Sequence, residues 1–236
     1  MPRALDRETS AIAEAAIASR GVILRLGVEA VEFIGDPVRG VRLADGTELT
    51  ADLVLAATGV KPHAGYLTSS PIATDWGVAV DDHLRTTLPN IVAAGDVAET
   101  RDLMTGERYV HAIFQNAVTQ APIAAANLLG ADLVYAGAEA MNSLKHLGVP
   151  IVAIGSTDDP DEILRYQTDD ALRSIYLRDG RIVGAQLAGD ISGVGTYRSL
   201  MHRRVDVRKF GRRLVEPRFG PANTVFDALP RRVALA

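Results

Sequence analysis

The stretch from Thr87 to Asp96 is the feature that most constrains what this chain can fold into. Its pattern predicts a buried β-strand that ends in small residues, Gly95 and Asp96. In a doubly wound α/β sheet, ligands bind in the crevice beyond the carboxyl ends of the strands. A glycine there lets the backbone approach a ligand, and an ionised aspartate offers hydrogen-bond acceptors only. The stretch therefore predicts a nucleotide-type site, although Asp96 could instead cap the segment that follows it.

Two further features flank this strand. Upstream, an apolar strand predicted over residues 52–57 ends at Thr58-Gly59. Downstream, small and apolar residues predict a helix that opens near Asn116 and runs to Gly130. A Thr-Gly pair alone could serve only a turn. The ordered set of strand, Thr-Gly, strand, Gly-Asp and helix is much more specific than any one of its parts.

In this order, the features resemble the FAD-dependent pyridine nucleotide-disulfide oxidoreductase superfamily. The resemblance covers nearly the whole chain, and its specific motifs lie between Asp52 and Asn127. Residues 187–198 are most similar to the flavin modules of NADH-dependent nitrite reductases, rubredoxin reductases and NADH oxidases. One departure is Ala121-Pro122, where the family commonly has Gly-Arg or Gly-Lys. Pro122 lies about one turn into the predicted helix, where its missing N–H costs little, so we expect the helix to survive.

The resemblance implies FAD and NAD(P)H as cofactors, and it implies roles for individual residues. Asp96, beside Gly95, would accept a hydrogen bond from the ribityl hydroxyls of FAD. Thr58 and Gly59 would lie where the chain crosses between two dinucleotide domains close to cofactor. The positive end of the predicted helix would face the pyrimidine edge of the isoalloxazine, which carries negative charge when reduced. The residues implied at that end of the helix are Gln115, Asn116 and Ala117.

The sequence lacks the feature that this superfamily uses to hold pyrophosphate. No Gly-x-Gly-x-x-Gly fingerprint occurs anywhere in the 236 residues. The glycines at 189, 193 and 195 follow a predicted strand, but their spacing is wrong and a structural turn is the favoured interpretation. We therefore expect the C-terminal portion of a flavoenzyme. A misplaced start codon, a split gene, a degraded gene and a trimmed product all remain open explanations.

The predicted fold class is α/β, with partial doubly wound FAD- and NAD(P)-binding domains followed by a C-terminal α+β domain. Residues 1–62 are expected to be the distal half of an NAD(P)-binding domain, with a helix, a strand over 21–26, a hairpin meander and the strand over 52–57. Residues 63–138 are expected to be the second half of an FAD-binding domain. Residues 139–236 are expected to form an interface domain that dimerises, built on a hairpin over residues 172–187.

Composition excludes several classes of protein. With 47% hydrophobic and 23% charged residues, the chain has the composition of a globular protein. Its apolar runs fall far short of the roughly 20 residues that span a bilayer, and no apolar leader follows Met1, so we expect a cytoplasmic protein without a membrane partner. A net charge of −4 gives no general attraction to nucleic acid. The basic stretch from Arg198 to Arg232 is either a solvated face or a docking site for an acidic partner.

The absence of cysteine limits the redox chemistry that these residues can perform themselves. With no cysteine, they can hold no redox-active thiol pair and no cysteine-ligated metal centre. The five histidines show no metal-ligand spacing, and we predict no metal site. We also predict no catalytic side chain, because hydride transfer between nicotinamide and flavin depends mainly on alignment.

The function that follows from the resemblance is that of an FAD-dependent NAD(P)H oxidoreductase. A hydride would pass from NAD(P)H to FAD, and electrons would pass on to an unidentified small molecule or small electron carrier. The expected partners are a second copy of the chain or a polypeptide that carries the missing N-terminal half. The alternative is a non-catalytic interaction or dimerisation subunit that retains only the scaffold of a flavoprotein.

Overall fold

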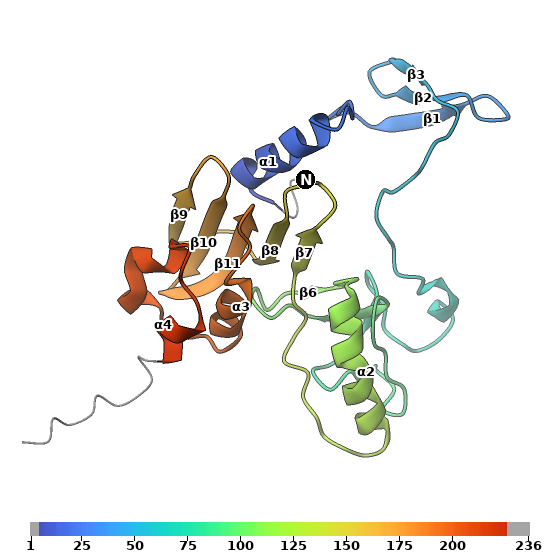
Figure 1. Cartoon of the computed structure of the whole chain (residues 1–236). Coiled ribbons are helices and arrows are strands. Elements are labelled where there is room, and N and C mark those ends of the chain that lie inside the picture. The colour runs from blue at the N-terminus through green and yellow to red at the C-terminus, as the bar shows by residue number, and fades with distance from the viewer. Residues whose placement is uncertain (1–4, 226–236) are drawn as a thin grey trace, which may run out of the picture. The chain divides into compact units, whose positions relative to one another are not determined.

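The computed structural model describes residues 5–225 (Figure 1). Their contacts divide them into two compact units: residues 17–61 form one, and residues 5–16 with 62–225 form the other. Helix α1, Arg7–Ala18, begins in the larger unit and ends at the boundary.

The smaller unit contains the predicted meander. Strands β1 (Ala30–Ile34), β2 (Gly40–Leu43) and β3 (Glu48–Thr50) form an antiparallel sheet in the order β1-β2-β3. The turn before β3 is the expected one: Gly46 has a φ of +87°, and the Thr47 N–H donates to Asp45 Oδ1 at 2.9 Å. This hairpin confirms the prediction from local turn chemistry.

The strands predicted over residues 21–26 and 52–57 are not formed, which corrects the sequence analysis. Both segments lie without strand pairing, and most of their apolar side chains are exposed. Ile23 is 82% exposed, Leu53 84% and Leu55 85%. Continuous apolar runs of this kind are typical of parallel strands that are covered on both faces. Within residues 17–61 no neighbouring strand pairs with them, so the predicted conformation has nothing to hold it.

A five-stranded antiparallel sheet dominates the C-terminal part of the larger unit (Figure 1). The hairpin predicted over 172–187 is confirmed as two of its strands. Both outermost strands were missed, because they mix polar with apolar residues and no residue in them is fully buried. The sheet order is β7-β8-β11-β10-β9. The strands are β7 (Met141–Leu144), β8 (Ile151–Gly155), β9 (Glu162–Gln167), β10 (Leu172–Arg178) and β11 (Arg181–Ala188).

The two faces of this sheet are covered by different elements. Helix α3 (Val194–His202) and the 3₁₀ segment η2 (Arg208–Val215) pack on one face, in a cluster that includes Val152 and Ile154. The alternate residues of β8 contact Leu5 and Ala13, so α1 covers the opposite face. A short helix, α4 (Pro221–Val225), follows η2.

Asp6 fastens the start of α1 to the sheet. Its backbone N–H donates to Gln186 Oε1 at 2.9 Å, and its carboxylate accepts from the Thr9 N–H at 2.7 Å and from Arg165 Nη2 at 3.0 Å. The Tyr176 hydroxyl also donates to this carboxylate. Burial raises the pKa of Asp6, but the hydrogen bonds from Tyr176 and Thr9 and the charge of Arg165 outweigh it, so the pKa lies below its usual value.

We expect the stability of the protein to fall with acid partly through Asp6. Because the folded state lowers the pKa of Asp6, its contribution is present above the unfolded value and is lost as pH falls below about 4. Asp6→Asn should cost about 1–2 kcal/mol at pH 7 and should flatten the decline in acid. Urea unfolding of the unaltered chain and of Asp6→Asn between pH 7 and pH 3 measures how the free energy of unfolding of each depends on pH. An unchanged slope in Asp6→Asn would exclude Asp6 as a source of the acid sensitivity, and Asp75→Asn, at an exposed carboxylate, is the control.

The rest of the larger unit is a small core around α2 (Phe114–Leu128), which continues through Pro122 as predicted. Strand β4 (Val78–Ala79) pairs in parallel with β5 (Ala98–Arg101), and β6 (Arg108–Tyr109) pairs antiparallel with β5. A short 3₁₀ turn, η1 (Gly65–Leu67), precedes them. The buried strand predicted before Gly95 is reduced to one bridge, between Arg85 and Val92, which corrects that prediction. As in the smaller unit, an apolar run lacks the parallel neighbours that would make it a full strand.

Candidate functional site

The Gly95-Asp96 turn lies against the first turns of α2. Gly95 has a φ of +78°, and a Cβ added to it would lie 3.5 Å from the Cβ of Ala117. Its N–H donates to Gln120 Oε1 at 2.6 Å. Asp96 follows with an exposed carboxylate. The structure therefore brings together three of the residues that the sequence analysis selected, Gly95, Asp96 and Ala117, on one side of the helix.

The N-terminus of α2 has no side-chain cap. The helix begins after Ile113, which has an extended backbone, and Phe114 and Gln115 are exposed. The N–H groups of Asn116 and Ala117 both donate to the carbonyl of Ile113, at 3.0 and 3.2 Å. The first N–H groups of this 15-residue helix and the positive end of its dipole lie at the two exposed residues, Phe114 and Gln115. Such an end can stabilise an electron-rich group placed before it.

Neither the backbone N–H nor the side chain of Asn116 is open toward this end of the helix, because the N–H bonds to Ile113 and the side chain bonds to Glu139. The Asn116 side chain is buried, and its Nδ2 donates to the carbonyl of Glu139 at 3.1 Å while its Oδ1 accepts from the Glu139 N–H at 3.0 Å. Gln120 and Asn127 are buried on the same face of α2. Polar residues thus line the inner face. Gln120, which holds Gly95, was missed by the sequence analysis, although its spacing of four residues from Asn116 was a usable signal.

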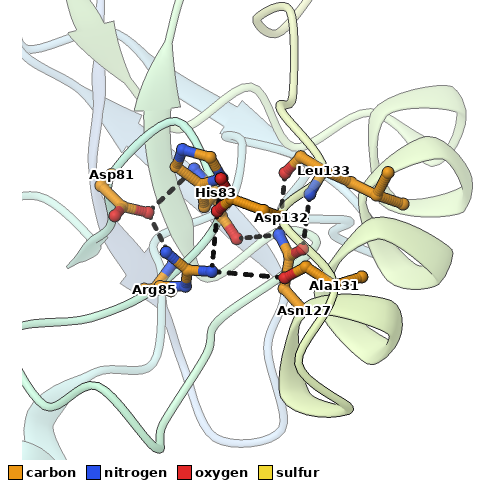
Figure 2. Close-up of polar contacts among 7 residues, drawn as sticks. All are labelled: Asp81, His83, Arg85, Asn127, Ala131, Asp132 and Leu133. Atoms are coloured by element: carbon orange, nitrogen blue, oxygen red, sulfur yellow. Dashed lines mark hydrogen bonds and ion pairs between the residues drawn. The ribbon is translucent and has the colours of Figure 1, made fainter.

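The other end of α2 is held by a polar cluster (Figure 2). Asn127 Nδ2 donates to the carbonyls of His83 and Leu133, both at 2.8 Å, and its Oδ1 accepts from the Leu133 N–H at 2.8 Å. Asp132 lies 3.2 Å from His83 Nδ1 and 3.1 Å from Arg85 Nη2. These bonds join the loop after β4 to the end of the helix. They hold the C-terminal end of α2 against that loop.

Thr58 and Gly59 belong to the smaller unit, where both are exposed. Gly59 has a φ of +101°, and a Cβ added to it would meet no atom within 4 Å. The backbone therefore demands glycine for its conformation, with open space beside it. The role of this pair beside a cofactor stays a prediction.

An Asp-His pair that the sequence analysis missed lines a cavity of about 420 Å³. His111 Nε2 lies 2.8 Å from Asp102 Oδ2. Burial raises the pKa of Asp102, but hydrogen bonds from His111 and from the N–H groups of Thr105 and Met104 outweigh it and lower the pKa overall. The bonds from the Met104 and Thr105 N–H groups also cap the turn between β5 and β6, which is a structural role for Asp102. Within residues 5–225, no group of three His, Asp or Glu side chains is arranged to hold a metal ion, and no helix is long and apolar enough to cross a bilayer.

The sequence matches known protein families and individual proteins of known activity. The sequence model of the pyridine nucleotide-disulphide oxidoreductase family matches residues 1–126, and that of the rubredoxin NAD+ reductase C-terminal domain matches residues 141–205. Nitrite reductase [NAD(P)H] of Bacillus subtilis is 30% identical over 213 residues, which are 88% of this chain and 26% of that protein. NADH-rubredoxin oxidoreductase of Clostridium acetobutylicum is 29% identical over 62% of this chain and 38% of its own length.

Solved structures of a ferredoxin reductase and an NADH oxidase have a similar fold. A ferredoxin reductase from Rhodopseudomonas palustris has a TM-score of 0.70 and 26% identity, over 80% of this chain and 48% of its own. A water-forming NADH oxidase from Lactobacillus brevis has a TM-score of 0.80 at 20% identity, over 93% of this chain and 54% of its own, and shows the fold alone. The chain spans less than half the length of the curated relatives named above. Because one family model matches more than half of the sequence, this chain belongs to the pyridine nucleotide-disulphide oxidoreductase family.

Proposed function

We propose that this chain supplies the C-terminal half of an FAD-dependent NAD(P)H oxidoreductase that passes electrons to a small electron carrier. FAD and NAD(P)H are the cofactors of its family. The observation that carries the proposal is the Gly95-Asp96 turn held against the uncapped N-terminus of α2. Relatives named for rubredoxin and ferredoxin support a carrier as the acceptor.

The residues present fit one part of a bound flavin. Asp96 offers an exposed acceptor carboxylate for ribityl hydroxyls, and Gly95 beside it presents backbone without a side chain. The open N–H groups of α2, at Phe114 and Gln115, would face the electron-rich edge of the ring. When bound, FAD would supply the hydride acceptor and the route for electrons. The chain's own task is to hold and orient it.

The rest of the cofactor needs groups that these residues do not supply. The sequence contains no Gly-x-Gly-x-x-Gly loop for a pyrophosphate. We propose that another polypeptide segment provides it and covers apolar surface that this chain leaves open. On α2, Phe114 is 76% exposed and Val118, one turn later, is 54% exposed, and Leu129, just after the helix, is 89% exposed. Phe114 and Val118 lie one turn apart on the same side of the helix, and we propose that the other segment covers them. The unpaired segments at 21–26 and 52–57 would become strands on such pairing.

Binding of FAD tests the proposal directly. The chain would be titrated with FAD, alone and co-expressed with a segment that carries the missing fingerprints, while flavin fluorescence and the visible spectrum are followed. We expect Asp96→Ala to weaken binding about tenfold or more, because a hydrogen bond to a charged group is worth about 1.5–3 kcal/mol. Asp75→Ala, at another exposed carboxylate of the same unit, is the matched control and should bind like the unaltered chain.

Two outcomes would oppose the proposal. Equal affinity of Asp96→Ala and the unaltered chain would remove Asp96 from the site. No flavin binding in the presence of the complementary segment would favour the non-catalytic scaffold instead. The cytoplasmic location and the assembly of oligomers through residues 139–236 stay proposals, and chromatography with light scattering checks the second of them.

A further inference from the structure

A strongly basic segment lies at the C-terminal end of the described chain. Residues 203–218 carry seven basic and two acidic side chains, a net charge of +5 in a protein whose total is −4. The rest of the chain is therefore clearly acidic, and the molecule is electrically asymmetric. The basic residues, all exposed, are Arg203, Arg204, Arg208, Lys209, Arg212, Arg213 and Arg218.

The basic segment is ordered by burial of its apolar residues. Phe210, Leu214 and Val215 of η2 are 5% or less exposed and pack in the cluster beneath the five-stranded sheet. The basic residues between them, Arg212 and Arg213, point away from that core and face solvent. The charges are thus presented on a fixed surface. Binding through them therefore costs little conformational entropy of the backbone.

Most of these charges are not neutralised by the chain itself. Arg208 lies 3.3 Å from Asp206, and the ammonium of Lys209 lies 4.9 Å from the centre of the Phe210 ring. For the remaining five arginines, no carboxylate within residues 5–225 comes within ion-pair distance. A cluster of unpaired cations on a rigid surface attracts a partner of opposite charge and orients it during approach.

The surroundings favour a protein as that partner over a membrane or a nucleic acid. A membrane-binding segment places apolar side chains beside its cations for insertion, whereas Phe210, Leu214 and Phe219 are buried. Single-stranded nucleic acid needs exposed aromatic rings for stacking, and the aromatic rings of this segment are covered. The acidic remainder of the chain would also repel a long polyanion.

We infer that the basic segment, residues 203–218, docks an acidic protein surface, that of the electron carrier in the proposed function. The inference rests on that function for the identity of the partner. The cations of η2 and its flanks would bind an acidic protein in a fixed orientation, and this binding would weaken as salt rises.

The test compares two charge-reversal variants that alter net charge equally. Arg212→Glu/Arg213→Glu reverses two cations of the basic segment, and Arg7→Glu/Arg20→Glu reverses two exposed cations elsewhere. Each is measured for binding to an immobilised acidic [2Fe–2S] ferredoxin, with basic cytochrome c as comparator, at ionic strengths from roughly 25 to 300 mM. Thermal unfolding of each variant confirms that it is folded.

We expect the first variant to bind the ferredoxin about tenfold more weakly at low salt and the second to change within about twofold. Binding by the unaltered chain should weaken as salt rises and should be absent with cytochrome c. Equal losses in the two variants, binding that ignores salt, or tighter binding to anionic vesicles or to single-stranded RNA would overturn the inference. The assay uses neither FAD nor NADH, so loss of docking with intact flavin binding would leave the proposed function standing.

Discussion

Replacement of Arg173 by alanine is expected to lower the free energy of unfolding by about 3–5 kcal/mol. Arg173 lies in β10 and is 0% exposed. Its guanidinium donates to the carboxylate of Asp190, to Ser192 Oγ at 3.0 Å and to the Glu216 carbonyl at 3.2 Å. Removing the side chain leaves a cavity in the core and takes partners from these groups. The effect is large because one residue joins β10, the turn after β11 and the chain after η2.

Chemical unfolding in urea measures the loss, and Arg203→Ala, at an exposed arginine without an ion pair among residues 5–225, is the control. The control should differ from the unaltered chain by less than about 0.5 kcal/mol. Arg173→Met, which keeps much of the apolar stem, should recover part of the stability if packing contributes beside charge. A loss below about 1 kcal/mol in Arg173→Ala would mean that water replaces the guanidinium at little cost.

Replacement of Gly189 by alanine is expected to destabilise the protein by about 3 kcal/mol or more. Gly189 has a φ of +75°, and a Cβ added to it would lie 1.9 Å from the carbonyl oxygen of Asp170, which belongs to rigid backbone. Its N–H donates to the Pro150 carbonyl at 3.0 Å, so the chain cannot move away without breaking that bond. These contacts give a structural reason for this glycine, in agreement with the interpretation of residues 189–195 as a turn.

Gly106→Ala separates the two causes of this loss. Gly106 has a φ of +77°, almost equal to that of Gly189, but an added Cβ would meet nothing within 4 Å. Its substitution should cost only the backbone strain of about 1–2 kcal/mol. The difference between the two unfolding free energies then measures the close approach at Gly189. Equal losses would assign the whole effect to the positive φ.

Local patterns in the sequence were sufficient for several elements. The helix at α1, the meander of β1 to β3, the hairpin of β10 and β11, and α2 with its proline all form where they were predicted. Each depends on interactions between residues close in the chain, such as the turn at Gly46 or the helical spacing of apolar residues. The family, too, followed from ordered local motifs, and the comparisons confirm it.

Other features depend on partners that are distant in the chain, and only the tertiary structure decided them. The runs at 21–26 and 52–57 have the composition of buried strands, yet they stay exposed because a parallel strand exists only beside its neighbours. Arg173 is the second residue of the buried strand β10, and no local pattern indicates that Asp190 and Glu216 will meet it. In the same way, the Asn116 side chain is hydrogen-bonded to the backbone of Glu139, a residue of another segment. By itself the sequence determined the family and the local elements, because neighbouring residues encode both; burial and pairing were decided by contacts that only the folded chain creates.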